Sequence, residues 1–190
     1  MAKVKLNPVL EGIRGAVGDL VFKKYGDEVI ISRKADMSGV EPSEAQLAHQ
    51  ARFKQATLFG NMVMADPETK ALYVEAAKAK GKPVFSLTVA DFFNAPSVDE
   101  VDLSGYTGAA GDEVIIMAHD DFDVMGVSVA LTDGEGNAIE GGEAVETPAD
   151  SGRWMYTATT AVDTGTTVRI AVTAVDRPGS VAEAEEEKAV

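Results

Sequence analysis

Two similar segments in the C-terminal half of the sequence constrain its fold more than any other feature. Residues 117–121 read MAHDD and residues 173–179 read TAVDRPG, so each is an apolar strand pattern that ends in an acidic turn. Both lie within a run of short alternating segments separated by Gly and Asp, which is typical of a small antiparallel β-sandwich. The pattern predicts the architecture of half the chain but indicates no particular activity or ligand, because β-sandwiches serve many unrelated functions.

Seven short strands can be assigned in this half, and seven strands over about 90–100 residues is the immunoglobulin-like number. The single tryptophan, Trp154, is expected in the core of the sandwich. The last strand is expected to dissolve into the acidic run at 183–188, as a solvated and partly frayed end. The expected strands are residues 101–106, 114–118, 127–132, 138–145, 154–158, 168–174 and a segment from 180 onward.

A β-hairpin is predicted near the N-terminus, with strands at 20–25 and 28–33 joined by a type II′ turn at residues 26–27. Its apolar residues lie on both faces, so the hairpin cannot stand alone in water. The helices that follow are expected to cover one face. The other face is covered either by a second protein chain or by the chain itself, through the arm at 4–13 or the sandwich. The residues predicted to make the contact between chains are Leu20, Phe22, Tyr25, Val29 and Ile31.

Two helices are predicted next, packed as an antiparallel helical hairpin. The first begins at a capping box formed by Ser43 and Gln46, and the second runs from an Asp66 cap to a left-handed end at Gly81. Residues 86–93 fit either a short helix or a strand. The predicted buried stripes are Leu47, Ala51, Leu58, Met62 and Ala65 on the first helix, widened by Phe53, Ala56, Gly60 and Val63, and Leu72, Tyr73, Ala76 and Ala77 on the second.

These elements predict an α+β N-terminal domain at residues 1–94, followed by an all-β immunoglobulin-like sandwich with an acidic C-terminal end at residues 95–190. The length of 190 residues and the 45% hydrophobic content suit two small domains better than one. The absence of cysteine excludes disulfides, thiolate metal sites and thiol nucleophiles. The net charge of −14 argues against nucleic acid as a partner, since phosphate binding needs Lys and Arg, and is ascribed to solubility.

The sequence offers no membrane or export signal. No apolar stretch approaches the about 20 residues that a bilayer-spanning helix needs, so membrane insertion is not expected. The first residues, MAKVKLNP, contain basic side chains but no continuous apolar region behind them. The expected location is therefore the cytoplasm, while export by a non-classical route or with a phage-like particle stays open.

Several short motifs are spread over nearly the whole chain. Near the N-terminus these are the Gly15-x-x-Gly18-x-x-Val21-Phe22 pattern and Gln46 followed by residues 52–53. The C-terminal motifs are residues 90–96 (ADFFNAP), 105–108 (GYTG), 118–122 (AHDDF), 154–159 (WMYTAT) and 174–179 (AVDRPG). Together these motifs resemble a widespread family of uncharacterised bacterial proteins. The resemblance implies a two-part design with a C-terminal immunoglobulin-like module, and it carries over no activity and no catalytic residue.

Four carboxylates are predicted to converge at one end of the sandwich, because the second and sixth strands end at the same edge. These are Asp120, Asp121, Asp123 and Asp176. Hard oxygen ligands in a loop suit Ca²⁺, and the cluster is a candidate metal site. Residues 121–132 are not an EF-hand loop, because Met125 occupies a ligand position and Thr132 stands where the loop needs a carboxylate. The alternative is a set of strand-ending turns with an Asp–Arg pair, in which Arg177, adjacent to Asp176, is the partner of the carboxylates without a metal.

No catalytic motif is recognisable in the sequence. Its two histidines are His49, expected on the polar side of the first helix, and His119, which could form a general acid–base pair with Asp121. Such His–Asp pairs are more often ordinary contacts between exposed polar side chains, so no enzyme activity is expected.

The expected function is that of a structural or interaction protein. It is a self-assembling or scaffold-associated subunit whose N-terminal hairpin contacts other protomers, through β-augmentation at an exposed edge in one version. The partner is a further copy or another protein. The alternative is a module that binds calcium or carbohydrate at the acidic loop end of the sandwich. A phage-derived and a host structural role are both compatible with the sequence.

Overall fold

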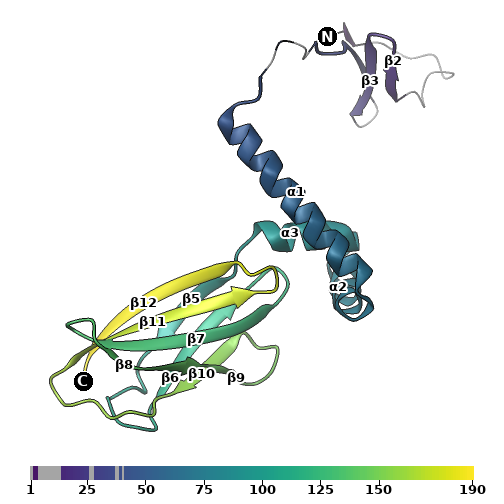
Figure 1. The fold of residues 1–190 in the computed structure, drawn as a ribbon. Helices are drawn as coiled ribbons and strands as arrows, with labels where there is room; N and C mark the ends of the chain where they lie inside the picture. Colours follow the sequence, from purple (N-terminus) through teal and green to yellow (C-terminus); the bar gives the residue numbers. More distant parts are fainter. Residues whose placement is uncertain (1, 4–13, 26–27, 37–38, 40) are drawn as a thin grey trace. The chain divides into compact units, whose positions relative to one another are not determined.

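The computed structural model describes residues 2–3, 14–25, 28–36, 39 and 41–190. The chain divides into two compact units, Met1–Leu47 and Ala48–Val190 (Figure 1). The boundary that the sequence indicates after residue 94 falls inside the second unit, where helices give way to strands. The expected fold class is confirmed, because a hairpin and helices precede an all-β sandwich.

The first unit contains an antiparallel sheet whose strands are arranged in the order β1-β4-β3-β2. The predicted hairpin is confirmed, since β3 pairs with β4 and places Leu20 opposite Arg33 and Tyr25 opposite Glu28. The turn predicted at residues 26–27 lies outside the described residues. The strands are β1 (Ala2–Lys3), β2 (Gly15–Val17), β3 (Leu20–Tyr25) and β4 (Glu28–Arg33).

Three helices follow, α1 (Glu44–Ala65), α2 (Pro67–Lys80) and α3 (Val84–Phe93). The predicted capping box is confirmed, since the Ser43 amide donates to the Gln46 side chain at 2.9 Å and the Gln46 amide donates back to the Ser43 hydroxyl at 3.3 Å. The Asp66 carboxylate caps α2 by accepting from the Thr69 amide, and Gly81 ends α2 with φ 62°. The ambiguous segment at 86–93 is helical.

The main row of the stripe predicted as the buried face of α1 is wrong, whereas three of the residues expected to widen that stripe are buried. Leu58 and Met62 are 56% and 70% exposed, whereas Ala56, Gly60 and Val63 form the buried face. The helix is apolar on two faces, and the face with smaller residues is buried because it lets α3 approach closely. A Cβ atom added to Gly60 would lie 2.7 Å from Oγ1 of Thr88 and 2.8 Å from Cε2 of Phe85. On α2, Tyr73 and Ala77 are buried as predicted, but Leu72 is exposed.

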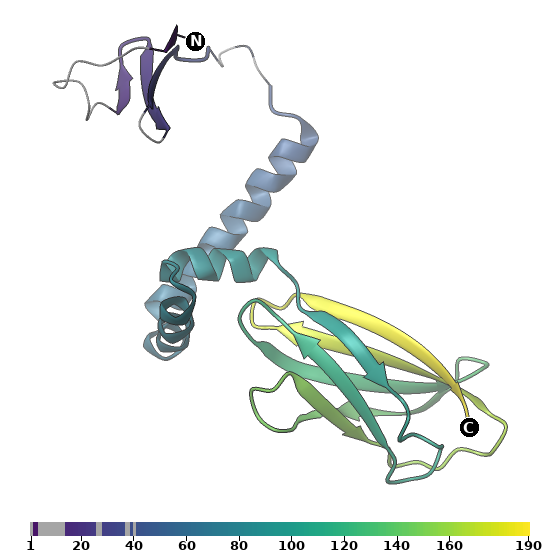
Figure 2. The ribbon, with the colours of Figure 1, turned by 180° about the vertical axis from the view of Figure 1, so that it is seen from behind.

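Two four-stranded antiparallel sheets lie face to face in the sandwich (Figures 1 and 2). One has the strand order β5-β6-β10-β9 and the other β12-β11-β7-β8. The strands are β5 (Ser97–Asp102), β6 (Glu113–His119), β7 (Val124–Asp133), β8 (Ala138–Glu143), β9 (Val145–Glu146), β10 (Arg153–Thr157), β11 (Thr167–Asp176) and β12 (Val181–Ala189).

The core of the sandwich is formed by alternate residues of its strands, as the period-2 pattern predicts. Trp154 is buried among them, which confirms the expectation for the single tryptophan. The first strand lies nearer the N-terminus than predicted, at Ser97–Asp102. The buried core residues are Tyr106, Val114, Ile116, Ala118, Val127, Val129, Leu131, Ala144, Trp154, Tyr156, Ala158, Val168, Ile170, Val172 and Ala174.

The prediction that the acidic C-terminal segment frays is wrong. Strand β12 pairs with β11 along its whole length, from Val181 opposite Val175 to Ala189 opposite Thr167. Main-chain hydrogen bonds hold such a strand whatever its side chains are. Its acidic residues are tolerated because β12 lies at the edge of its sheet, where charge also discourages pairing with another chain.

Candidate functional site

The acidic turn after β6 joins the helices to the sandwich within the second unit. Phe122 inserts into the helical core and stacks on Tyr73 of α2, with ring centroids 3.8 Å apart. Lys80 of α2 donates to the main-chain carbonyl of Asp121, and the Asn94 amide donates to the Asp121 carboxylate. We call this region the helix–sandwich joint and define it as Tyr73, Asp91, residues 120–123 and residues 176–177.

A carboxyl group lies at the centre of the joint. Asp91 of α3 is fully buried and accepts a hydrogen bond from the Tyr73 hydroxyl. Asp120 lies within hydrogen-bonding reach of Asp91, and Asp176 is close enough to interact with both carboxyl groups electrostatically. The Oδ1 atoms of Asp91 and Asp120 and the Oδ2 atom of Asp176 are buried without a hydrogen-bond donor among the described residues. Three acidic side chains from three segments therefore lie close together, of which Asp91 and Asp176 are buried and Asp120 is half-buried.

The joint disfavours negative charge on Asp91. Burial raises the pKa of Asp91 to about 7, the neighbouring Asp120 raises it as well, and only the hydrogen bond from Tyr73 opposes the change. Burial also raises the pKa of Tyr73 and that of Asp176. The common cause is a surrounding of low polarity, which stabilises the neutral form of an acid.

One basic side chain reaches the joint from the end of β11. The Arg177 guanidinium lies 5.7 Å from the centroid of the Phe122 ring, and its Nη2 donates to Oδ2 of Asp123 at 3.3 Å. Asp176 instead accepts from the main-chain amides of Gly179, at 2.7 Å, and Ser180. The structure therefore contains an Asp–Arg pair like the one offered as the alternative to a metal, but Arg177 pairs with Asp123 and not with the adjacent Asp176.

The four predicted metal ligands are distributed over different contacts. Asp120 caps its own turn by accepting from the amides of Phe122 and Asp123, while Asp121, Asp123 and Asp176 have the partners given above. Within the part of the chain that the structure describes, no group of three or more His, Asp or Glu side chains is placed to hold a metal ion. We assign no metal ligand in this structure, and calcium or carbohydrate binding stays a prediction from the sequence.

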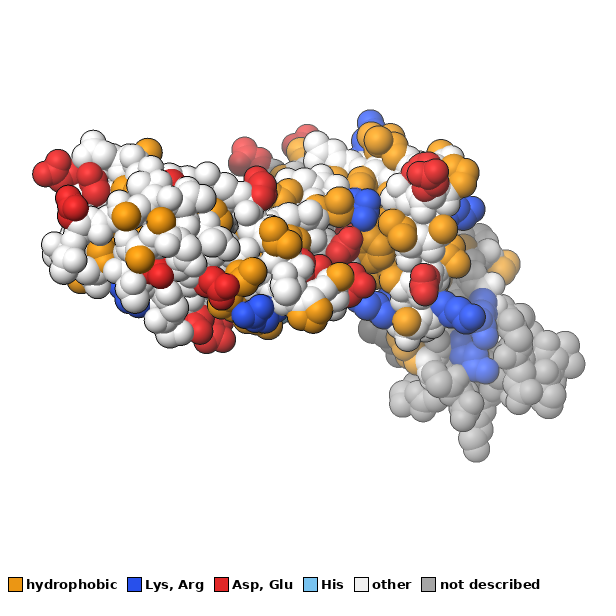
Figure 3. All heavy atoms as spheres, turned by 90° about the horizontal axis from the view of Figure 1, so that it is seen from below, with side chains coloured by type: hydrophobic (Ala, Val, Ile, Leu, Met, Phe, Trp, Pro, Cys, Tyr) orange, Lys and Arg blue, Asp and Glu red, His pale blue; other side chains and the backbone are white. Residues whose placement is uncertain are grey.

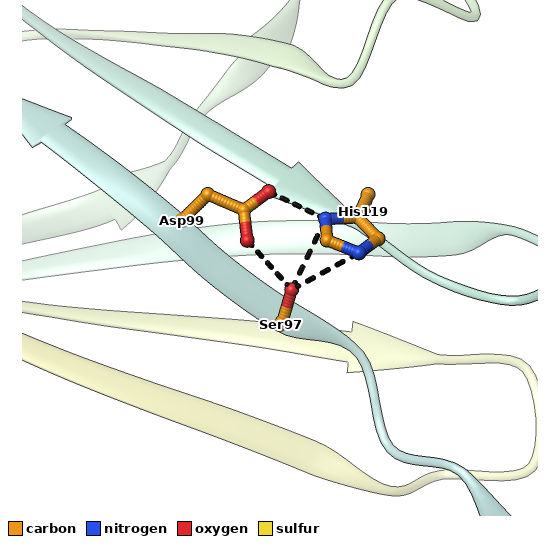
Figure 4. A network of polar contacts seen from close by, with 3 residues as sticks. All are labelled: Ser97, Asp99 and His119. Atoms are coloured by element: carbon orange, nitrogen blue, oxygen red, sulfur yellow. Dashed lines mark hydrogen bonds and ion pairs between the residues drawn. The ribbon is translucent and has the colours of Figure 1, made fainter.

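A second polar cluster lies on the surface of the sandwich, where β5 runs beside β6 (Figure 4). His119 contacts the Asp99 carboxylate through Nδ1, so the pairing predicted with Asp121 is wrong. Ser97 donates to Oδ1 of Asp99 at 2.9 Å, and its oxygen lies 3.1 Å from His119 Nδ1 and 3.5 Å from Nε2. The hydrogen bond with His119 is the main reason why the pKa of Asp99 is lowered.

This cluster contains the residue types of a serine-hydrolase triad, but its geometry differs from that of a triad. A triad places the carboxylate on one ring nitrogen and the serine on the other. Here the serine and the carboxylate gather at the same nitrogen, and the serine hydrogen bonds to the carboxylate. His119 is also largely exposed, with 68% of its side chain accessible. The arrangement suits a surface hydrogen-bond network.

The predicted contact residues of the hairpin differ in exposure. Leu20 and Tyr25 are exposed, at 42% and 62%, while Phe22 and Ile31 are half-buried and Val29 is buried. Large exposed apolar side chains also gather on the helices, where Figure 3 shows orange side chains with Lys and Arg among them. The helical ones are Leu47, Phe53, Leu58, Met62, Leu72, Val74 and Phe85. His49, Phe53 and Leu58 border a mostly apolar hollow on α1, together with Gln50, Lys54 and Thr57.

Sequence reasoning missed Asp91 and Asp99. Asp91 stands in the apolar segment 84–93, and an acid inside such a run is the one local signal of a special role. Asp99 has no such signal, because its partner His119 is brought to it only by the pairing of β5 with β6.

No protein-family model matches the chain, and no curated protein sequence matches it. Among solved structures, the chain is similar to CopC from Methylosinus trichosporium OB3b, with 14% sequence identity and a TM-score of 0.37. The match covers 48% of this chain and 89% of CopC. A likeness at that level carries no argument about this chain. Among the described helices, none is long and apolar enough to cross a membrane.

Proposed function

We propose that the protein is a non-catalytic structural or interaction subunit that self-assembles through its N-terminal sheet. The observation that carries this proposal is that the described residues of that sheet form no internal core. Among the described residues of the first unit, Val29 is the one apolar residue that is buried. A sheet needs an apolar partner surface for stability in water, and a few strands alone do not supply it.

The amino-acid pattern of the sheet supports the same proposal. Strand β4 carries Val29, Ile30 and Ile31 in succession, so apolar side chains point to both faces. On β3, Leu20 and Tyr25 are exposed, and Val17 of β2 is 64% exposed. Side chains of this kind in contact with water favour association, because burial gains about 25 cal/mol for each Å² of apolar surface removed from water.

The non-catalytic part of the proposal is supported by the polar clusters. The Ser97, Asp99 and His119 network does not have the arrangement of a triad, and Asp91 and Asp176 of the helix–sandwich joint are buried rather than open to a substrate.

Light scattering coupled to size exclusion, over a hundredfold range of concentration, tests the proposal. The wild-type protein is expected to show a mass that rises with concentration. The double variant Leu20→Glu, Tyr25→Glu is expected to elute as a monomer at every concentration, because each charge would have to be buried in the contact. A wild-type protein that stays monomeric throughout would show the proposal to be wrong.

A matched control distinguishes this contact from non-specific hydrophobic association. Met125 lies on the sandwich and is 49% exposed, which is comparable to Leu20. The Met125→Glu variant is expected to keep the wild-type dependence of mass on concentration. If Met125→Glu abolishes assembly while the hairpin variant does not, the contact surface lies on the sandwich instead.

A further inference from the structure

One face of the N-terminal sheet combines apolar side chains with basic ones. Residues paired directly across neighbouring strands share a face, so the register of the strands divides the sheet into two faces. On one of them the charged residues that the structure describes are Lys24 and Arg33, both exposed and without a hydrogen-bond or ion-pair partner among the described residues. We call this side of the sheet the basic face. Its apolar residues are Val17, Leu20, Phe22, Val29 and Ile31.

The sandwich has the opposite charge. Residues 95–190 contain 20 Asp and Glu against 4 Lys and Arg, so they account for the whole of the net charge of −14. A surface that is apolar and basic is attracted to one that is acidic, whereas two basic faces repel each other. The partner that suits the basic face is therefore the sandwich of a second copy rather than a second N-terminal sheet.

The outer face of one sandwich sheet carries an acid at each edge. In the sheet β12-β11-β7-β8, one row of paired residues crosses all four strands. The neighbouring pair Val172 and Val129 is buried in the core, so this row points outward. Its two terminal acids are exposed and have no hydrogen-bond or ion-pair partner among the described residues. The row consists of Glu183, Thr173, Ser128 and Glu143.

The two acids and the two bases have the same spacing. Glu183 and Glu143 lie on the first and last of four adjacent strands, and three strand separations of about 4.8 Å place their Cα atoms about 14 Å apart. Arg33 pairs with Leu20, so it is offset from Lys24 by four residues along the strand and by one strand across. At about 3.3 Å for each residue, these Cα atoms are also about 14 Å apart. The acids are spaced across their strands and the bases along theirs, which corresponds to two sheets stacked with strongly crossed strands.

We propose that the basic face of one copy packs on the outer face of the β12-β11-β7-β8 sheet of a second copy, with its two bases against the two edge acids. This inference rests on the proposed function and names the surface that the N-terminal sheet contacts. Burial of the apolar residues of the basic face supplies the attraction, and the charges fix the orientation. The contact joins two different surfaces, so each copy can bind one neighbour with each, and the assembly grows head to tail into a ring or a filament.

An exchange of charge between the two surfaces tests the proposal in the full chain. The base-reversed variant is Lys24→Glu with Arg33→Glu, and the acid-reversed variant is Glu143→Lys with Glu183→Lys. Each variant alone presents like charges to itself, so each is expected to be monomeric in light scattering at concentrations at which the wild type is assembled. An equal mixture of the two is expected to assemble, because each variant then meets opposite charges on the other.

A matched control tests whether position or net charge is responsible. Glu100 of β5 and Glu113 of β6 are exposed acids on the other sheet of the sandwich. The variant Glu100→Lys with Glu113→Lys changes the net charge as much as the acid-reversed variant does, and it is expected to assemble as the wild type does. If a reversed variant does not fold, the corresponding pair of Gln substitutions replaces it and should raise the concentration needed for assembly by up to about tenfold.

The possible failures can be told apart. A wild-type protein that is monomeric at every concentration overturns the proposed function and this inference with it. A wild type that assembles, together with an acid-reversed variant that assembles equally well, overturns this inference alone. A mixture that stays monomeric also overturns it, and so does a control that loses assembly as completely as the acid-reversed variant.

Discussion

The sandwich and the N-terminal sheet are both antiparallel, but they use apolar residues differently. In β11 the residues Val168, Ile170 and Val172 alternate with residues that face outward, and all three are fully buried. In β4 the apolar residues are consecutive, and Val29 alone is buried. One apolar face can be covered by one opposing sheet, whereas two apolar faces need two partners. The described strands of the sandwich therefore cover each other's apolar faces, whereas the described residues of the N-terminal sheet leave large apolar side chains exposed, which is the basis of the proposed assembly.

The largest effect is expected from a cavity in the core of the sandwich. Ile170→Ala should lower the free energy of unfolding by about 2–5 kcal/mol, because it removes a fully buried side chain from a close-packed site. Urea unfolding followed by the fluorescence of Trp154, which lies in the same core, measures this loss. Val29→Ala is the counterpart in the first unit and should leave the Trp154 transition where it is. An equal shift in both variants would contradict the independence of the two units.

A smaller effect on stability is expected from a substitution on the buried face of α1, and none from a substitution on its exposed face. Gly60→Ala should destabilise the helices by about 1–3 kcal/mol, because the new Cβ would lie too close to Thr88 and Phe85. The clash outweighs the gain of about 1 kcal/mol that alanine brings to a helix interior. Thermal unfolding followed by circular dichroism at a helical wavelength measures the change. Asn61→Ala, on the exposed side of the same helix, is the control and should be neutral or slightly stabilising. A stabilised Gly60→Ala variant would show that α3 can move away.

The sequence predicts two kinds of element. In one kind the hydrogen-bond partners lie close together along the chain, and in the other the apolar residues recur at a single regular spacing. Residues such as Val127, Val129 and Leu131 alternate in β7, and that alternation alone places them in the core. The Ser43 cap lies next to the helix that it begins, and it too was predicted correctly. Where the apolar residues of a helix fit two different buried faces, the sequence does not show which face is buried. Leu58 and Ala56 lie on different apolar faces of α1, and only the close approach at Gly60 decides which face is buried.

The joint could not be predicted from local sequence because its contacts join segments far apart. The pKa of Asp91 is raised by burial and by the neighbouring Asp120. The spacing of apolar residues along the sequence does not show that Asp120 lies beside Asp91. The acidic turn itself was predicted correctly as the end of a strand, but its partners were not. Likewise, the sequence of β12 is typical of a solvated acidic tail, because its own residues do not indicate the ladder of main-chain hydrogen bonds that it forms with β11.

The dependence of stability on pH should have opposite signs for an acid of the joint and an acid of the sandwich surface. The raised pKa of Asp91 means that its contribution is favourable at low pH and is lost as the pH rises from about 4 towards about 7. Asp112 accepts from the amides of Thr107 and Ala109 and from the Thr107 hydroxyl, and these bonds lower its pKa. Its contribution is therefore present at neutral pH and is lost as the pH falls below its ordinary range near 4.

Unfolding in urea at a series of pH values measures both contributions. Asp91→Asn should remove the decline between about pH 4 and about pH 7 and should be more stable than the wild type above it. Asp112→Asn should be less stable than the wild type at neutral pH, and the difference should shrink in acid. Two variants whose profiles shift in the same direction would contradict the contrast between an enclosed acid and a hydrogen-bonded one.

The smallest effect is expected for the charges on the outer face of β11 and β12. Arg169 bonds to Glu185 at 2.8 Å and to Glu187 at 2.9 Å, and all three side chains are about half exposed. Water and salt screen such pairs, and ordering the long side chains offsets much of the attraction. Arg169→Gln should therefore change the urea midpoint only slightly, and the difference should vanish in 1 M salt, where the screening length is about 3 Å. A loss that persists in high salt would mean that β12 depends on its side chains rather than on its main-chain ladder. The edge of the sandwich would then rely on specific contacts, as the N-terminal sheet is proposed to do.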